Sequence, residues 1–156
     1  MGAMRLSASE TIDRPAPDVF RFIATEHWQN HPKWDPAIVE LTQTTPGAVG
    51  VGARAKLVRV DRGRRNEGTV EVIGFEADRR FAAVSRFGPF ILVQRASLTS
   101  LEDRHTRIDL TIDSRASGIL GLMLWLMRPR FRRTMASSLR TIKEEVERAS
   151  PPSTGP

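Results

Sequence analysis

The sequence contains no cysteine, and this absence removes several kinds of chemistry at once. Disulfides, thiolate nucleophiles, cysteine-based metal sites and thiol redox centres are all excluded. A membrane-spanning stretch is also missing: the apolar run at residues 118–127 has ten residues, whereas a spanning helix needs about 20. The N-terminus lacks an apolar signal segment, so we expect a cytoplasmic protein.

Signatures of catalysis and cofactor binding are missing as well. There is no serine nucleophile elbow and no paired acidic motif, and the glycines at 47–53 lack the lysine of a phosphate loop. Two of the three histidines, His27 and His31, could share a helix face, but Pro32 disturbs that helix and no third metal ligand follows by spacing. We therefore predict no metal site, no cofactor and no catalytic residue.

His27 and His31 also allow a catalytic interpretation. Either ring could pair with Asp35 and act as a general base, because a carboxylate fixes the imidazole tautomer and raises its basicity. The interpretation we prefer is that Trp28 and Trp34 cap the core while both histidines are solvated or hydrogen-bonded locally.

The chain is basic, with 24 Lys and Arg against 18 Asp and Glu and a formal net charge of +6. A positive field favours anionic partners. Most arginines are scattered, which is typical of a solvated surface, but two groups are clustered: Arg62, Arg64 and Arg65, and then Arg128, Arg130, Arg132 and Arg133. A protein, ribosome or nucleic-acid interaction module that uses these clusters remains an alternative, although we consider nucleic acid the less favoured partner.

Hydrophobic periodicity predicts one mixed domain at residues 1–149, followed by a disordered tail at 150–156. Residues 6–12 and 106–114 alternate apolar and polar side chains, as strands do. Seven strands are predicted, at 6–12, 38–44, 53–60, 69–75, 80–87, 90–101 and 106–114. Pro17 and Asp18 open a short helix after the first strand, and a second short helix follows it.

The last third of the chain, residues 118–148, predicts a long helix. An apolar stripe recurs at steps of three and four from Phe131 through Met135, Leu139, Ile142 and Val146. Residues 119–127 are apolar all round, so we expect apolar neighbours on more than one side of them. Trp125, together with the second arginine cluster, could alternatively contact an acidic membrane surface.

These elements predict an α+β fold, a curved seven-stranded antiparallel sheet wrapped round the long C-terminal helix with two short helices between strands 1 and 2. One helix is too narrow to fill such a concavity, so we expect a cavity between sheet and helix. On the strand at 90–101, alternation places Gln94 inward and Arg95 outward. Gln94 could then orient a carbonyl or hydroxyl group of an apolar ligand.

Three stretches carry a family resemblance: RPAPDVFRFI at 14–23, HPKWDPAIVELTQTTPGAVGVGARAKL at 31–57 and GILGLMLWLM at 118–127. Together they resemble the START-like, or birch-pollen-allergen-like, superfamily (SRPBCC), and within it the bacterial polyketide cyclase/dehydrase and lipid-transport group. The resemblance implies a helix-grip fold with a hydrophobic cavity for lipids, sterols or polyketides. Several relatives use cavity tyrosines, and the absence of tyrosine here argues against a cyclase mechanism.

We therefore predict a carrier or sensor, a monomer or homodimer, that binds a hydrophobic small molecule such as a lipid, polyketide or isoprenoid without turnover. The alternative is a polyketide cyclase/dehydratase-type enzyme. The predicted ligand-binding residues are Trp28, Trp34, Leu57, Val70, Val72, Phe81, Phe90, Leu92, Gln94, Leu98, Ile108, Leu110, Leu122, Met123, Leu126, Met127 and Met135.

Overall fold

The structure is a computed structural model that describes residues 2–149; the tail predicted at 150–156 lies outside the described residues. The elements are β1 (Gly2–Ile12), α1 (Ala16–Phe20), the π-helical turn η1 (Arg21–Thr25), α2 (His27–Trp34), β2 (Ile38–Gln43), β3 (Arg54–Asp61), β4 (Arg64–Glu76), β5 (Arg80–Phe87), β6 (Phe90–Ser100), the 3₁₀ turn η2 (Glu102–Arg104), β7 (Thr106–Ala116), α3 (Ile119–Leu126) and α4 (Arg128–Ala149).

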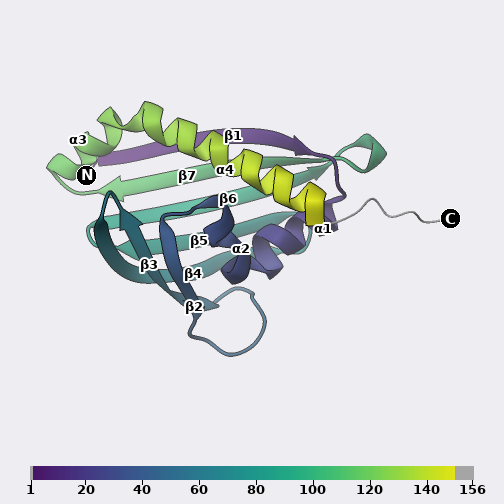
Figure 1. The fold of residues 1–156 in the computed structure, drawn as a ribbon, viewed down its shortest axis with the longest axis horizontal. Helices are drawn as coiled ribbons and strands as arrows, with labels where there is room; N and C mark the ends of the chain where they lie inside the picture. The colour runs from purple at the N-terminus through teal and green to yellow at the C-terminus, as the bar shows by residue number, and fades with distance from the viewer. Residues whose placement is uncertain (1, 150–156) are drawn as a thin grey trace.

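The seven strands form one antiparallel sheet in the order β1-β7-β6-β5-β4-β3-β2. Among the strands of residues 2–149, only β1 and β7 join distant parts of the chain; their register runs from Gly2 opposite Ala116 to Ile12 opposite Thr106. The sheet curves round α4, which runs obliquely across it, with α1 and α2 near one end (Figure 1). This arrangement confirms the predicted helix-grip fold.

The amphipathic stripe of α4 faces the sheet. Met135, Leu139, Ile142 and Val146 are each at most 3% exposed and belong to the main core cluster. Polar bonds fix the C-terminal end of the helix: the Lys143 ammonium donates to the Thr11 carbonyl at 2.7 Å. None of the helices within residues 2–149 is long and apolar enough to span a bilayer.

The β3–β4 hairpin is tighter than the sequence predicted. We expected residues 61–68 to be its connection, but β4 begins at Arg64, and only Arg62 and Gly63 turn the chain. Both have positive φ, at 51° and 77°, which is the backbone twist that two-residue hairpins require. Four polar residues, 64–67, therefore extend the strand, because the ladder with β3 outweighs their low strand propensity.

The C-terminal helix is divided at Met127. The Met127 amide donates to the Met123 carbonyl at 3.0 Å and ends α3, while the Met127 carbonyl accepts from the amides of Arg130 and Phe131. Pro129 explains the break: it has no amide to continue the α3 ladder, but it fits the first turn of a new helix.

The apolar neighbours that we expected on more than one side of residues 119–127 are present on only one side in the structure. Leu122, Met123 and Leu126 are 57%, 48% and 63% exposed, and Met127 is half-buried. The reason is the position of α3, which packs against β1 and β7 at the sheet edge and not inside the curve of the sheet. The prediction that these side chains face the interior was wrong for the three exposed residues.

Candidate functional site

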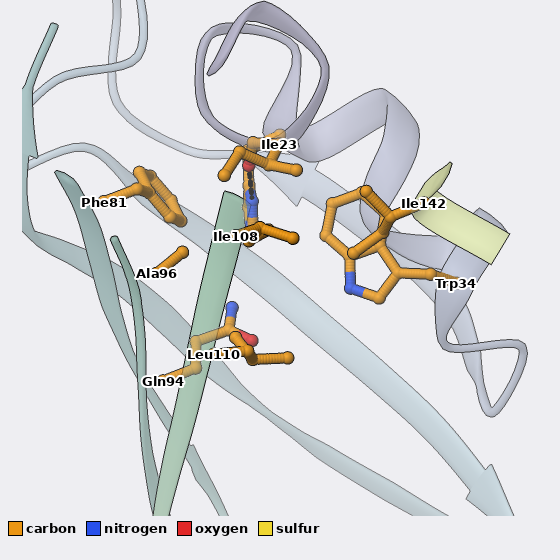
Figure 2. Close-up of a pocket in the computed structure, with 9 residues that line it drawn as sticks. Ile23, Trp34, Phe81, Gln94, Ala96, Ile108, Leu110 and Ile142 are labelled. Carbon is orange, nitrogen blue, oxygen red and sulfur yellow. Dashed lines mark hydrogen bonds between the residues drawn. The ribbon is translucent and has the colours of Figure 1, made fainter. Parts of the chain in front are cut away.

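A small cavity lies between the sheet and the helices, where α2 and α4 cross β5, β6 and β7. Its volume is about 20 Å³, room for about one water molecule. In Figure 2, Trp34 and Ile142 lie on one side, Phe81 and Ala96 on the other, and Gln94 at the end away from Ile23. The lining is almost entirely carbon and comprises Ile23, His27, Trp34, Phe81, Gln94, Ala96, Ile108, Leu110 and Ile142.

His27 is the most deeply buried polar residue of this lining, at 1% exposure. Its Nδ1 lies 2.7 Å from the carbonyl oxygen of Ile23. A carbonyl can only accept, so Nδ1 carries the proton and Nε2 has a lone pair. Nε2 is buried and has no hydrogen-bond partner among the described residues. The site therefore holds one unused hydrogen-bond acceptor in apolar surroundings.

Both α2 histidines are held neutral. Burial lowers the pKa of His27 well below 6.5, because the cation would lose its hydration, and the neighbouring His31 lowers it further. The pKa of His31 is lowered to about 3, first by burial and then by the charge of Arg59. Of the two expected alternatives, solvation or local hydrogen bonding, neither ring is solvated, and His27 is hydrogen-bonded locally to the Ile23 carbonyl. Both rings are buried among aromatic rings: the ring centroids of Trp34 and His31 lie 5.0 Å apart, and those of Phe81 and His27 lie 4.6 Å apart.

The Asp35 carboxylate forms no hydrogen bond with the ring of His27 or His31 within the described part of the chain. It accepts from the Arg59 guanidinium at 2.5 Å, and Asp61 accepts from the same guanidinium at 3.2 Å. Burial alone would lower the pKa of Arg59, but the two carboxylates raise it overall. The cation also lies over the Phe87 ring at 5.3 Å. The His–Asp35 pair considered from the sequence is therefore not formed.

Gln94 is half-buried on β6 and lines the cavity, while its neighbour Arg95 is exposed and bound to Asp113 at 2.8 Å. No hydrogen bond joins the Gln94 side chain to another residue within the described part of the chain. An amide offers both a donor and an acceptor. Together with His27, it gives the cavity two polar groups of different kinds.

The predicted ligand-binding residues fall into four sets. Trp34, Phe81, Gln94, Ile108 and Leu110 line the cavity. A second set is buried in the core away from the lining: Trp28, Leu57, Val70, Val72, Leu98 and Met135. Phe90 and Leu92 are partly buried against the core. The fourth set, on or next to α3, lies outside the cavity: Leu122, Met123, Leu126 and Met127.

Four lining residues were not among the predicted site residues: Ile23, His27, Ala96 and Ile142. Ile142 lies on the predicted apolar stripe of α4, so the signal was present, but most of the helical ligand-binding residues were predicted on or next to α3. His27 carried a weaker signal, the spacing of two histidines one helical turn apart.

Two side-chain bonds hold α2 over the cavity. The Ser138 hydroxyl on α4 donates to the Trp34 carbonyl at 2.8 Å, and the Asn30 amide donates to the Phe22 carbonyl at 3.0 Å. The first bond joins α2 to α4, and the second joins α2 to the π-helical turn. A π turn is often found at functional sites. These contacts position Trp34 and His27, whose ring centroids lie 5.8 Å apart, in the lining of the same carbon-lined space.

Comparison with solved structures finds this fold in proteins of low sequence identity. Zhui aromatase/cyclase from Streptomyces sp. R1128 is 16% identical with a TM-score of 0.75, covering 99% of both chains. A START superfamily protein from Mycobacterium smegmatis is 14% identical with a TM-score of 0.73, covering 94% of this chain and 99% of that one. A protein from Thermus thermophilus is 20% identical with a TM-score of 0.72, covering 95% of this chain and 100% of that one. At these identities the likeness shows the fold.

A search of curated proteins finds no match. Residues 3–147, however, match the family described as polyketide cyclase / dehydrase and lipid transport. Because this match spans nearly the whole chain, the protein belongs to the polyketide cyclase / dehydrase and lipid transport family.

Proposed function

We propose that the protein binds a small apolar molecule bearing a hydroxyl group in the cavity between the sheet and α4. The observation that supports this is the unpartnered Nε2 of His27, which is buried at 1% exposure in a carbon-lined space that Gln94 also reaches. A buried acceptor without a donor costs free energy, and a ligand hydroxyl would satisfy it.

Binding requires the cavity to enlarge. Sites for small molecules usually measure about 300–1,000 Å³, whereas this cavity measures about 20 Å³. Trp34 covers one side, and α2 is joined to α4 by the Ser138 bond to the Trp34 carbonyl. Parting α2 from α4 would open the space without disturbing the sheet. The ligand would then replace contacts that Trp34 now makes.

Binding is favoured over catalysis by the electrostatics of the site. A general base works best when its pKa lies near the working pH. The pKa of His27 is held well below 6.5 by burial, so the ring is a weak base but a good hydrogen-bond acceptor at neutral pH. No tyrosine is present in the chain to orient an enolate. A carrier or sensor therefore suits the site better than a cyclase.

The test compares p-cresol with p-xylene, which have nearly the same shape, because p-cresol carries a hydroxyl group where p-xylene carries one of its two methyl groups. In NMR titrations, p-cresol should bind about tenfold more tightly, because only the hydroxyl can donate to His27. Substitution His27→Phe should abolish that difference while leaving p-xylene binding within about twofold, and Gln94→Leu should reduce it. If the two compounds bind equally to the unchanged protein, the proposed role of His27 is wrong.

A further inference from the structure

The side of α3 that faces away from the sheet is apolar and uncovered. Ile119, Leu122, Met123 and Leu126 follow the spacing i, i+3, i+4, i+7 and are 76%, 57%, 48% and 63% exposed. Trp125, 61% exposed, extends this stripe. The opposite side, with Gly121 and Leu124, is buried toward β1 and β7. Five of the eight residues of α3 therefore present large apolar side chains to solvent.

No other described helix or strand exposes so many large apolar side chains. The remaining exposed large apolar side chains stand singly, one to a strand or loop, and they are Val39, Val51, Val60, Ile73, Ile91 and Leu101. Scattered exposed residues need no explanation, but a contiguous apolar patch marks an interaction surface. The stripe on α3 is such a patch.

The net positive charge of the protein lies next to this stripe. Residues 118–143 hold six basic residues and no acidic one, which equals the net charge of +6 of the whole chain. Three of them, Arg130, Arg132 and Arg133, are exposed in the first turns of α4. None of these three forms an ion pair with a carboxylate of residues 2–149. Their charge is therefore available to an anionic partner.

We propose that these residues form a docking surface for an acidic lipid bilayer. The α3 surface, defined as Ile119, Leu122, Met123, Trp125 and Leu126 with Arg130, Arg132 and Arg133, combines the two features of a helix that lies in a membrane interface. Apolar side chains enter the acyl boundary, and nearby cations attract anionic headgroups. Tryptophan is enriched at that boundary because its ring is amphipathic.

A bilayer fits the surface better than two other occupants. A second copy would bring two sets of unpaired arginines together, which like-charge repulsion opposes. Nucleic acid would satisfy the arginines but leave the five apolar side chains of α3 in water. Only an acidic bilayer covers the apolar stripe and neutralises the cations together. The surface lies outside the cavity lining, so this inference does not depend on ligand binding.

Vesicle binding of the full chain tests the proposal, with Trp125 as the reporter. Trp28 and Trp34 are each 8% exposed, so a change in tryptophan emission on binding should come from Trp125, which is 61% exposed. With vesicles of phosphatidylcholine and phosphatidylglycerol, the emission should shift to the blue, and bromolipids should quench it. Pure phosphatidylcholine should bind at least about tenfold more weakly, and added salt should weaken binding.

Two sets of variants separate the apolar and the ionic contributions to vesicle binding. Substituting Arg130, Arg132 and Arg133 by Gln should weaken binding about 100-fold, whereas the same change at the exposed Arg64, Arg80 and Arg86 should weaken it less than about tenfold. Leu122→Ser with Leu126→Ser should weaken binding at least about tenfold, whereas Val39→Ser with Val51→Ser, equally exposed elsewhere, should not. Circular dichroism confirms that each variant is folded.

Several outcomes would overturn the proposal. One is the absence of binding to acidic vesicles at low salt; another is equal binding by the α3 variants and their controls. Analytical ultracentrifugation that shows a dimer dissociated by Leu122→Ser with Leu126→Ser would identify a second copy as the occupant. Tighter binding to duplex DNA than to acidic vesicles, lost in the Arg130, Arg132 and Arg133 variant, would identify nucleic acid.

Discussion

The rings of His27 and His31 lie 4.7 Å apart on successive turns of α2, and both are buried. Burial lowers both pKa values: that of His31 falls to about 3, with a further contribution from the charge of Arg59, and that of His27 falls well below 6.5, with a further contribution from His31. The pair makes the stability of the fold depend on pH.

We predict that the protein loses stability as the pH falls from about 6.5 toward 3. In that range the unfolded chain binds protons at both histidines and the folded chain does not, so the free energy of unfolding decreases with falling pH. The loss should be about 2 kcal/mol per histidine between pH 7 and pH 5. Urea denaturation at these pH values measures it. His31→Gln should flatten the dependence, and an unchanged pH dependence in this variant would contradict the prediction.

Replacing Arg59 should change both stability and the titration of His31. Arg59→Met leaves Asp35 and Asp61 without their cation, and we expect a loss of about 1–3 kcal/mol in the free energy of unfolding. The pKa of His31 should rise from about 3, because the Arg59 charge contributes to its depression. NMR titration of the imidazole protons measures this rise. Arg95→Met is the control, since Arg95 is 52% exposed and its ion pair should be worth less than about 1 kcal/mol. An unchanged His31 pKa in Arg59→Met would show that the Arg59 charge does not act on this ring.

Gly68→Ala should destabilise the sheet. A Cβ atom at this position would lie 1.9 Å from the Arg86 carbonyl oxygen on β5, so the two strands would have to separate. We expect a loss of about 1–3 kcal/mol in thermal or urea denaturation. Gly50→Ala is the matched control, because a Cβ there meets no atom within 4 Å. Equal stability of the two variants would show that β4 and β5 are not this close.

Ser138→Ala should loosen the contact between α2 and α4. It removes the hydrogen bond to the Trp34 carbonyl, which should cost about 1 kcal/mol of stability. If the cavity opens by parting these helices, p-cresol should associate faster with this variant in stopped-flow or NMR exchange measurements. Ser137→Ala, at the exposed neighbouring position, should change neither quantity. Slower association in Ser138→Ala would argue for another route of entry.

The periodicity of the sequence predicted most of the fold, because apolar residues recur at a fixed spacing in a helix or strand that is buried on one face. The stripe from Met135 to Val146 is buried as predicted, and seven strands form the expected sheet. The apolar run of α3 led to a wrong prediction of its surroundings, because apolar composition does not specify where a helix lies in the fold. A helix that is apolar all round normally has cover on all sides, but α3 lies at the sheet edge and is covered on one side.

The candidate site was predictable only in part. Strand alternation places Gln94 correctly at the cavity, because a strand has a fixed period of two. His27 could not be placed in the same way, since its burial depends on the π-helical turn before α2 and on the hydrogen bond from its Nδ1 to the Ile23 carbonyl. The partner of Asp35, Arg59, lies 24 residues away on β3, a distance no local pattern encodes.

Intermolecular NOEs in the p-cresol complex locate the bound ligand on the protein. If p-cresol binds in the cavity, its ring protons should give NOEs to the methyl groups of Ile108, Leu110 and Ile142, which line the cavity. NOEs confined to Leu122 and Leu126 on the exposed side of α3, with none to the cavity methyl groups, would contradict it.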